Sequence, residues 1–144
     1  VSNTVRTPDL MAEAGLIYHT DWVHDDQPVP INVASGKLIS VPYSFELNDA
    51  PTFRTHFDGD YFVRMCKAQF DQLYEEGEES GRVMCISLHP YVIGQPHRIK
   101  YLDEVLKYIM SHDAVWQTTA DEIAEYYIAN YYDATVAHAK SINS

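Results

Sequence analysis

The chain has 144 residues, of which 46 % are hydrophobic and 22 % are charged, as in an ordinary globular domain with a sizeable core. Its 21 acidic residues outnumber 10 basic ones, and the net charge is −11. This charge argues against nucleic acid and anionic lipid as partners, because both need basic surfaces, and it permits neutral or cationic small substrates. No apolar run is long enough to span a membrane and no signal-peptide pattern opens the chain, so we expect a cytoplasmic protein.

The N-terminal part is predicted to contain one helix and a set of short strands. Thr7 is typical of an N-cap, Pro8 of a first helical residue and Gly15 of a helix end. Strands are predicted over 16–22, 31–33 and 38–41, the last two as a hairpin.

The remainder alternates helices with strands. Helical spacing predicts helices over 59–79, 99–109 and 119–131, the last begun by a capping box of Thr119 and Glu122, and apolar runs predict strands over 83–88 and 115–118. After about Asp133 the periodicity is lost, and we expect fraying there. Cys66 and Cys85 are expected to be buried free thiols. The alternation is typical of a largely parallel α/β sheet, and about four strands are too few to close a barrel alone.

His89 is the foremost candidate for a catalytic residue. It comes directly after the apolar run 83–88 and directly before Pro90. In α/β barrels the catalytic side chains sit where parallel strands end, and histidine can exchange a proton near neutral pH. The alternative is a histidine that only packs in the core or in a loop.

Asp21 and Trp22 end another predicted strand. Asp21 could orient a cation or His89, and Trp22 could form an apolar wall or simply pack in the core. Asp25 and Asp26 could contact substrate, or they could be turn residues.

A polar segment after the strand 38–41 mixes hydrogen-bond donors and acceptors. Tyr43, Glu46, Asn48 and Asp49 suit recognition of an amide or ureide, which has both N–H and C=O edges, although a plain polar loop is the alternative. Tyr43 could also donate to a developing oxyanion. Further along, Gln95 could contact substrate or belong to a structural turn.

No metal or nucleotide pattern stands out. His19 and His24 lie near Asp25 and Asp26, but their spacing is not that of a helical ligand pair and no third ligand is evident. The sequence has no Gly-rich phosphate loop, no Gly-x-Ser-x-Gly elbow and no Cys-x-x-Cys pair.

The segment Ile86-Ser87-Leu88-His89 resembles the Leu-x-Leu-His motif of the polysaccharide-deacetylase family (carbohydrate esterase family 4, NodB-homology domain). Other segments, in order, are similar to the allantoinase-like and peptidoglycan-deacetylase-like branch of that family. They are residues 7–15, Asp21-Trp22, Asp25-Asp26-Gln27-Pro28, Val41-Pro42-Tyr43, Glu46-Leu47-Asn48-Asp49, His89-Pro90 and Gly94-Gln95-Pro96. The resemblance extends from about Ser2 to Tyr132.

The resemblance implies an irregular (β/α) barrel of seven strands that hydrolyses C–N bonds. Most members use a divalent metal, zinc or a similar ion, held by one Asp and two His, and a second Asp as base. Those residues come from a Thr-Phe-Asp-x-Asp type run and a His-x-x-x-His type run near the domain's N-terminus, and this sequence contains neither. We therefore expect residues 1–144 to be the C-terminal portion of the catalytic domain, and any metal to be bound outside this chain.

By resemblance, His89 is the general acid that protonates the leaving nitrogen, and Glu46 and Asn48 have pocket roles. The substrate would be an N-acetyl sugar, peptidoglycan or a cyclic amide or ureide, the partner would be the N-terminal half of the same domain, and a homo-oligomer is expected. The alternative is a non-catalytic half-domain that binds a ligand or assists assembly. An open half-barrel exposes strand edges and an apolar face, so we expect it to be unstable alone.

Overall fold

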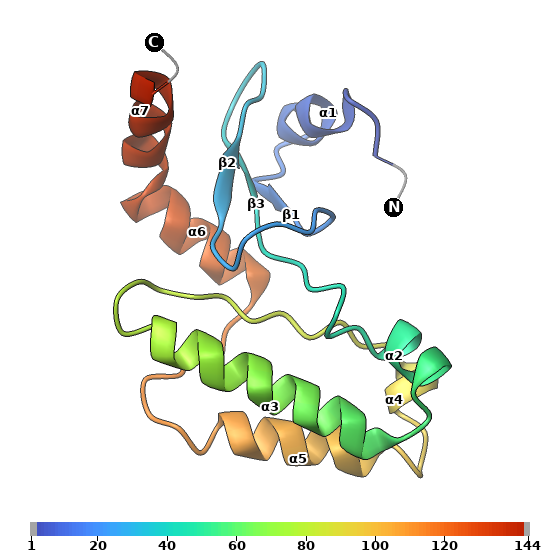
Figure 1. Cartoon of the computed structure of the whole chain (residues 1–144). Coiled ribbons are helices and arrows are strands. Elements are labelled where there is room, and N and C mark those ends of the chain that lie inside the picture. The colour runs from blue at the N-terminus through green and yellow to red at the C-terminus, as the bar shows by residue number, and fades with distance from the viewer. Residues whose placement is uncertain (1–2, 143–144) are drawn as a thin grey trace. The chain divides into compact units, whose positions relative to one another are not determined.

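The computed structural model describes residues 3–142 (Figure 1). The chain forms two compact units. The first unit takes in the described residues up to Pro42 and from Gln117 onward, and the second unit is Tyr43–Trp116.

The first unit contains a small mixed sheet. Its strands are β1 (Tyr18–His19), β2 (Val29–Ile31) and β3 (Leu38–Ser40), in the order β1-β3-β2. β3 is buried throughout, and it runs parallel to β1 and antiparallel to β2. The predicted hairpin is confirmed, and Gly36 in its turn has a φ of +74°, which glycine adopts without strain.

Three helices belong to the first unit in the described residues: α1 (Thr7–Glu13), α6 (Ala120–Asn130) and α7 (Tyr132–Ile142). The capping box that opens α6 is confirmed. The prediction of Thr7 as an N-cap is wrong by one residue, because the Thr7 hydroxyl accepts from the backbone N–H of Thr4 and Arg6 is the N-cap.

The expected fraying after Asp133 is also wrong, because α7 continues as a helix to Ile142. Its start is attached to the hairpin: Lys37 Nζ lies 2.8 Å from the Asp133 carboxylate and 4.7 Å from the centre of the Tyr132 ring. These contacts are not visible in the periodicity of the tail, and they help to order its first turn.

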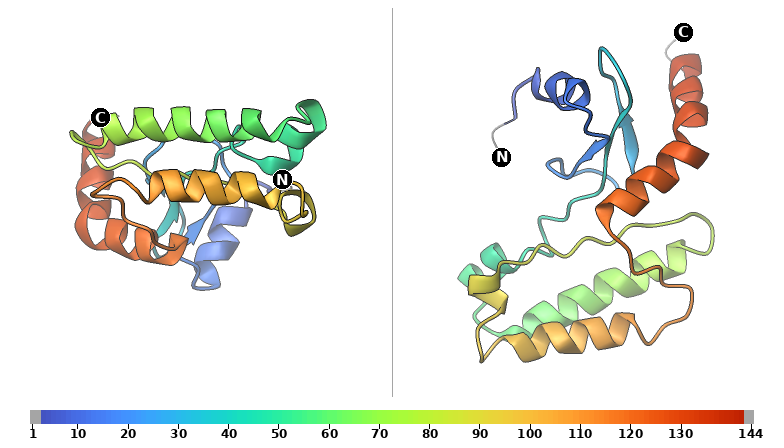
Figure 2. Two further views of the ribbon diagram at one scale, coloured as in Figure 1. Left: turned by 90° about the horizontal axis from the view of Figure 1, so that it is seen from below. Right: turned by 180° about the vertical axis from the view of Figure 1, so that it is seen from behind.

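The second unit is mainly helical, with α2 (Asp49–Thr55), α3 (Gly59–Glu76), α4 (Pro90–Ile93) and α5 (Ile99–Ile109). α3 and α5 lie alongside each other (Figure 2). Their apolar faces join a core that consists of Leu47, Phe53, Phe62, Val63, Cys66, Ile93 and Val105. Cys66 is fully buried and Cys85 half-buried, both as free thiols, and burial raises the pKa of the Cys66 thiol to about 12.

The predicted parallel sheet of about four strands is only partly present. The run 83–88 is extended, but within the described residues it makes a single parallel bridge, between Ser87 and Asn48. The run 115–118 is no strand, and the pair β2–β3 is antiparallel. An apolar run becomes a strand only when a neighbouring backbone completes its hydrogen bonds, and the described residues do not provide those neighbours.

The packing of the start of α3 against Tyr101 can be tested by substitution. A Cβ atom built on Gly59 lies 2.0 Å from the Tyr101 ring, whereas one on Gly81 meets nothing within 4 Å. An alanine normally stabilises a helix relative to glycine, yet Gly59→Ala should lower the free energy of unfolding by about 1–3 kcal/mol because the ring must move. Gly81→Ala is the matched control and should be neutral or slightly stabilising in denaturant titrations. Equal effects of the two substitutions would contradict this packing.

Candidate active site

His89 stands at the junction between the extended segment and α4. It is the N-cap residue of α4, with φ −118° and ψ 118°, and Pro90 takes the next position, where its missing N–H is not needed. The turn closes at Gly94, where an added Cβ atom would lie 2.3 Å from the Pro90 carbonyl oxygen. The short helix therefore holds the His89 backbone in one conformation.

Asp49 is the residue that orients His89. Its side chain is fully buried at the first position of α2, and its Oδ1 lies 2.6 Å from His89 Nδ1. Its Oδ2 accepts from the backbone N–H groups of His89 (2.9 Å) and Ile93 (3.2 Å). An ionised carboxylate only accepts, so Nδ1 carries a proton. Nε2 is then the nitrogen of this half-exposed ring that can exchange a proton with a ligand.

The two parts of this pair are brought together by backbone pairing. The Asp49 N–H donates to the Ser87 carbonyl (3.1 Å), and the Ser87 N–H donates to the Leu47 carbonyl (3.0 Å). Two extended segments thus end side by side, one leading into α2 and the other into His89. Within the described residues, the Ser87 hydroxyl is buried without a hydrogen-bond partner.

Asn48 and Tyr43 form the entrance to α2. Asn48 Oδ1 accepts from the Ala50 N–H and caps the helix, and its Nδ2 donates to the Tyr43 hydroxyl (2.8 Å). The Tyr43 oxygen is an acceptor in this bond, so its own hydroxyl proton is free to turn toward another acceptor.

Two other predicted site residues of the second unit are exposed. Glu46 accepts from the Ser44 hydroxyl at 3.4 Å. Gln95 donates to the Tyr91 carbonyl at 3.2 Å, so its amide helps to fix the turn after α4.

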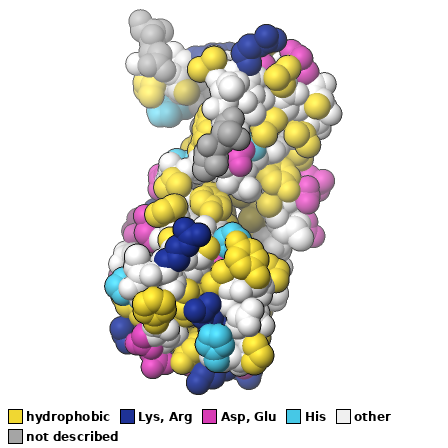
Figure 3. Space-filling view, turned by 90° about the vertical axis from the view of Figure 1, so that its right-hand side faces the viewer, with side chains coloured by type: hydrophobic (Ala, Val, Ile, Leu, Met, Phe, Trp, Pro, Cys, Tyr) yellow, Lys and Arg dark blue, Asp and Glu magenta, His cyan; other side chains and the backbone are white. Residues whose placement is uncertain are grey.

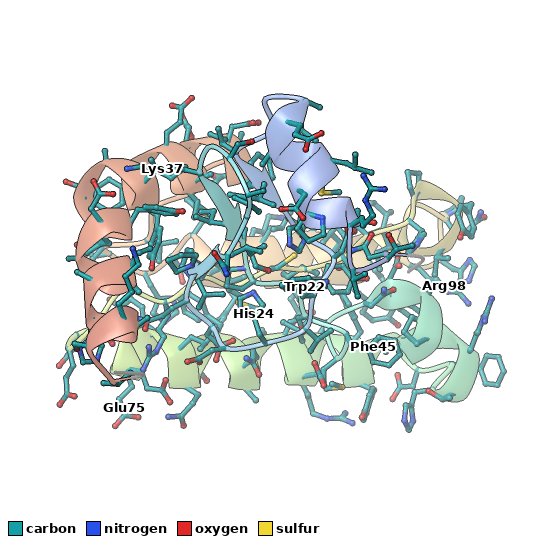
Figure 4. All side chains as sticks on the ribbon, turned by 90° about the horizontal axis from the view of Figure 1, so that it is seen from above. Trp22, His24, Lys37, Phe45, Glu75 and Arg98 are labelled. Carbon is teal, nitrogen blue, oxygen red and sulfur yellow. The ribbon has the colours of Figure 1, made fainter. Side chains whose placement is uncertain are left out.

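The other predicted site residues, Asp21, Trp22 and Asp26, belong to the first unit and lie on the loop that follows β1. Trp22 is labelled in Figure 4. Asp21 is partly exposed and accepts from Asn3 Nδ2, and the Trp22 ring meets the His19 ring edge-on at 4.7 Å. The Asp26 N–H donates to the Asp25 carboxylate, as in a turn. The sequence offered Asp21 a role in orienting His89, and within the second unit the residue bonded to the His89 ring is Asp49.

The sequence interpretation placed Asp49 in the right segment but gave it no role toward His89. The signal that could have found it is an acidic residue that directly follows Asn48, a good N-cap, and so opens a helix. That signal predicts a helix start, but it does not say which distant residue the carboxylate meets.

A second polar group surrounds the buried His19 of β1. Its Nδ1 accepts from the Asp21 N–H at 3.2 Å, so Nε2 bears the proton, and Nε2 has no partner within the described residues. Desolvation lowers the pKa of His19, against the opposing effect of Asp21, so the ring is neutral at pH 7. A cavity of about 420 Å³ adjoins it, lined also by Tyr18 and Asp121. Burial and Asp121 raise the pKa of Tyr18.

These residues do not fit a metal. Across residues 3–142, no three His, Cys, Asp or Glu side chains gather closely enough to hold an ion. His24, the other histidine near this loop, bonds the Ser40 hydroxyl through Nε2 at 2.7 Å. The divalent metal that the resemblance implies therefore has no binding site in the described part of the chain.

Comparisons with known proteins give related sequences and folds. A Schizosaccharomyces pombe protein whose name marks it as a candidate polysaccharide deacetylase is 36 % identical over 117 residues, which are 76 % of this chain and 36 % of that protein. The crystal structure of PuuE allantoinase matches with a TM-score of 0.83, at 32 % identity over 90 % of this chain and 44 % of that one. No protein-family model matches.

A probable polysaccharide deacetylase from Pseudomonas aeruginosa PAO1 matches with a TM-score of 0.78, at 31 % identity over 85 % of this chain and 42 % of that one. The resemblance to the polysaccharide-deacetylase family is thus confirmed: the chain is homologous to polysaccharide deacetylases and to an allantoinase over most of its length. It spans less than half the length of each of these relatives. Within residues 3–142, no helix is both long and apolar enough to cross a membrane.

The environment of His19 predicts a pH-dependent stability. Its pKa is lowered in the folded chain relative to about 6.5 in the unfolded chain, so the unfolded state binds more protons as the pH falls below about 7. Stability is therefore lost on acidification in this window, and His19→Gln should reduce that loss. The measurement is the free energy of unfolding at about pH 7.5 and about pH 5.5.

The control is His97→Gln, at an exposed histidine, which should leave the difference in unfolding free energy between the two pH values unchanged. An unaltered difference in His19→Gln would contradict the assignment.

Proposed function

We propose that this chain supplies the general acid of a hydrolase that cleaves non-peptide C–N bonds, in N-acetyl groups of sugars or in a cyclic amide or ureide. The observation that carries the proposal is the pair of His89 with the buried Asp49. Relatives whose names are polysaccharide deacetylase and allantoinase support the same general reaction.

The proposed chemistry follows from the leaving group. An amide nitrogen is too basic to depart as an anion, so it must be protonated as the C–N bond breaks. His89 would hold that proton on Nε2 and deliver it to the nitrogen. Asp49 would fix the orientation of the ring by the bond to Nδ1.

Substrate contacts are proposed for the other residues that the sequence singled out. Tyr43 has a hydroxyl proton free to bond a developing oxyanion, and Glu46 is exposed and able to accept from a substrate N–H. Asn48 supports Tyr43 through its amide. Further contacts are proposed for Asp21, Trp22, Asp26 and Gln95.

The attacking water has no activating group assigned in this chain. We propose that the N-terminal half of the domain binds a divalent metal, zinc or a similar ion, and completes the active site. A homo-oligomeric assembly and a cytoplasmic location are part of the same proposal.

A second candidate function is a non-catalytic half-domain that binds a ligand or assists assembly. It is favoured by the lack of a metal-binding group among residues 3–142. A test of His89 in the assembled protein separates the two candidates.

Replacing the acid should abolish efficient turnover. We expect His89→Ala, in the enzyme with its metal half present, to lower kcat by about 100-fold or more, since general acid catalysis contributes about 10²–10⁴-fold. Because His89→Ala leaves Oδ1 of the buried Asp49 without its ring partner, His89→Asn, whose amide can still donate to that oxygen, is made beside it, and near-UV circular dichroism checks that both variants are folded. His97→Ala, at an exposed histidine, is the matched control. Undiminished turnover of His89→Ala would rule out His89 as the general acid, whereas no turnover in the assembled wild-type protein would favour the non-catalytic alternative.

Replacing the orienting carboxylate tests the pair independently of turnover. Asp49→Asn should shift His89 away from the form protonated at Nδ1, because the backbone N–H groups of His89 and Ile93 hold the amide oxygen and leave the amide nitrogen, a donor, facing Nδ1. ¹⁵N chemical shifts of the ring report the tautomer directly. In the assembled enzyme kcat should fall about tenfold or more with little change in KM, since Asp49 is buried and acts through His89. Asp103→Asn, at an exposed carboxylate that pairs with Lys107, is the control. An unchanged His89 tautomer in Asp49→Asn would refute the pair.

A further inference from the structure

Tyr91 is a large aromatic side chain next to the proposed acid. It is the second residue of α4, and its side chain is exposed, at 72 % of the residue's surface. The centre of its ring lies 5.4 Å from that of His89, and the ring planes meet at 65°. Single exposed apolar residues are common on protein surfaces, so exposure alone means little.

The backbone that carries Tyr91 is held firmly. The N–H groups of Val92 and Ile93 both lie within hydrogen-bond distance of the His89 carbonyl, at 2.8 and 3.1 Å. Gln95 donates to the Tyr91 carbonyl, and the Ile93 side chain is buried in the core. The exposed ring is thus presented from the same fixed turn that holds His89. A binding group on a rigid support loses little conformational entropy when it meets a ligand.

The surroundings of the ring suit a neutral ligand. Hydrophobic side chains gather over α2 and α4, beside histidine and basic side chains (Figure 3). The nearest buried carboxylate, that of Asp49, is already bonded to His89 and Ile93 and does not face outward as a free charge. An aromatic face in such a place stacks on the flat or apolar face of a ring.

We propose that Tyr91 is a substrate-stacking residue, which binds the face of a neutral ring that carries the scissile C–N bond and holds that bond beside His89. This inference rests on the proposed function. It gives Tyr91 a role in substrate specificity and no part in the proton transfer. The ring could be a pyranose with an N-acetyl group or a cyclic ureide, which share the ring and the amide.

The test is binding to the assembled protein, with its N-terminal half present, measured by isothermal titration with three probes: an N-acetylglucosamine trimer, allantoin, and N-methylacetamide as an amide without a ring. Tyr91→Ala should weaken binding of at least one ring probe about fivefold or more, and Tyr91→Phe should retain it, since stacking needs the ring and not the hydroxyl. Binding of N-methylacetamide should be the same in both variants. The probe that is weakened identifies the ring class.

Phe57→Ala is the matched control, because Phe57 is an equally exposed aromatic residue, at 82 %, in the same unit. The proposal is overturned if the assembled wild-type protein binds neither ring probe, if Tyr91→Ala binds as the wild type does, or if Phe57→Ala loses as much affinity. Titrating His89→Asn separates this inference from the proposed acid role. Ring binding that survives in His89→Asn and fails in Tyr91→Ala supports stacking whatever the turnover of His89 variants.

Discussion

The carboxylate of Asp49 is fully buried, and a buried charge is tolerated only where its oxygens are bonded. Three partners meet that requirement: the His89 ring and the backbone N–H groups of His89 and Ile93. The start of α2, the end of the extended segment and the whole of α4 are therefore tied to one side chain. Removing any of these partners would leave part of a charge without compensation inside the protein, which is strongly destabilising. The same bonds that stabilise the second unit also fix the orientation of the His89 ring.

Local chemistry explains which features could be predicted from the sequence. The α6 capping box, the hairpin around Gly36 and the long helix α3 depend on residues near one another in the chain, and each is present. His89 was predicted because an apolar run that ends in a histidine is itself a local pattern. The start of α1 was misplaced by one residue because the hydroxyl of Thr7 has a nearer backbone N–H to bond.

The features that could not be predicted depend on contacts between distant residues. Asp49 and His89 are 40 positions apart, and no periodicity relates them. The attachment of α7 through Lys37 and Asp133 spans 96 positions. The extended run before His89 has an apolar strand sequence, but in the described residues it makes a single bridge, because strand formation depends on a neighbouring backbone that the run itself does not encode. A barrel is a property of the closed set of strands, and its individual strands carry only part of that information.

The two cysteines differ in burial, so that one of them can be labelled selectively. Because burial raises the pKa of the Cys66 thiol to about 12, this thiol stays protonated at neutral pH and reacts slowly with alkylating reagents. Cys85 is only half-buried and lies in the extended segment that leads to His89. A maleimide fluorophore or a nitroxide label would therefore be directed to one position close to the proposed acid, without any engineered cysteine. The sequence thus provides a spectroscopic reporter of how a partner or a ligand approaches this segment.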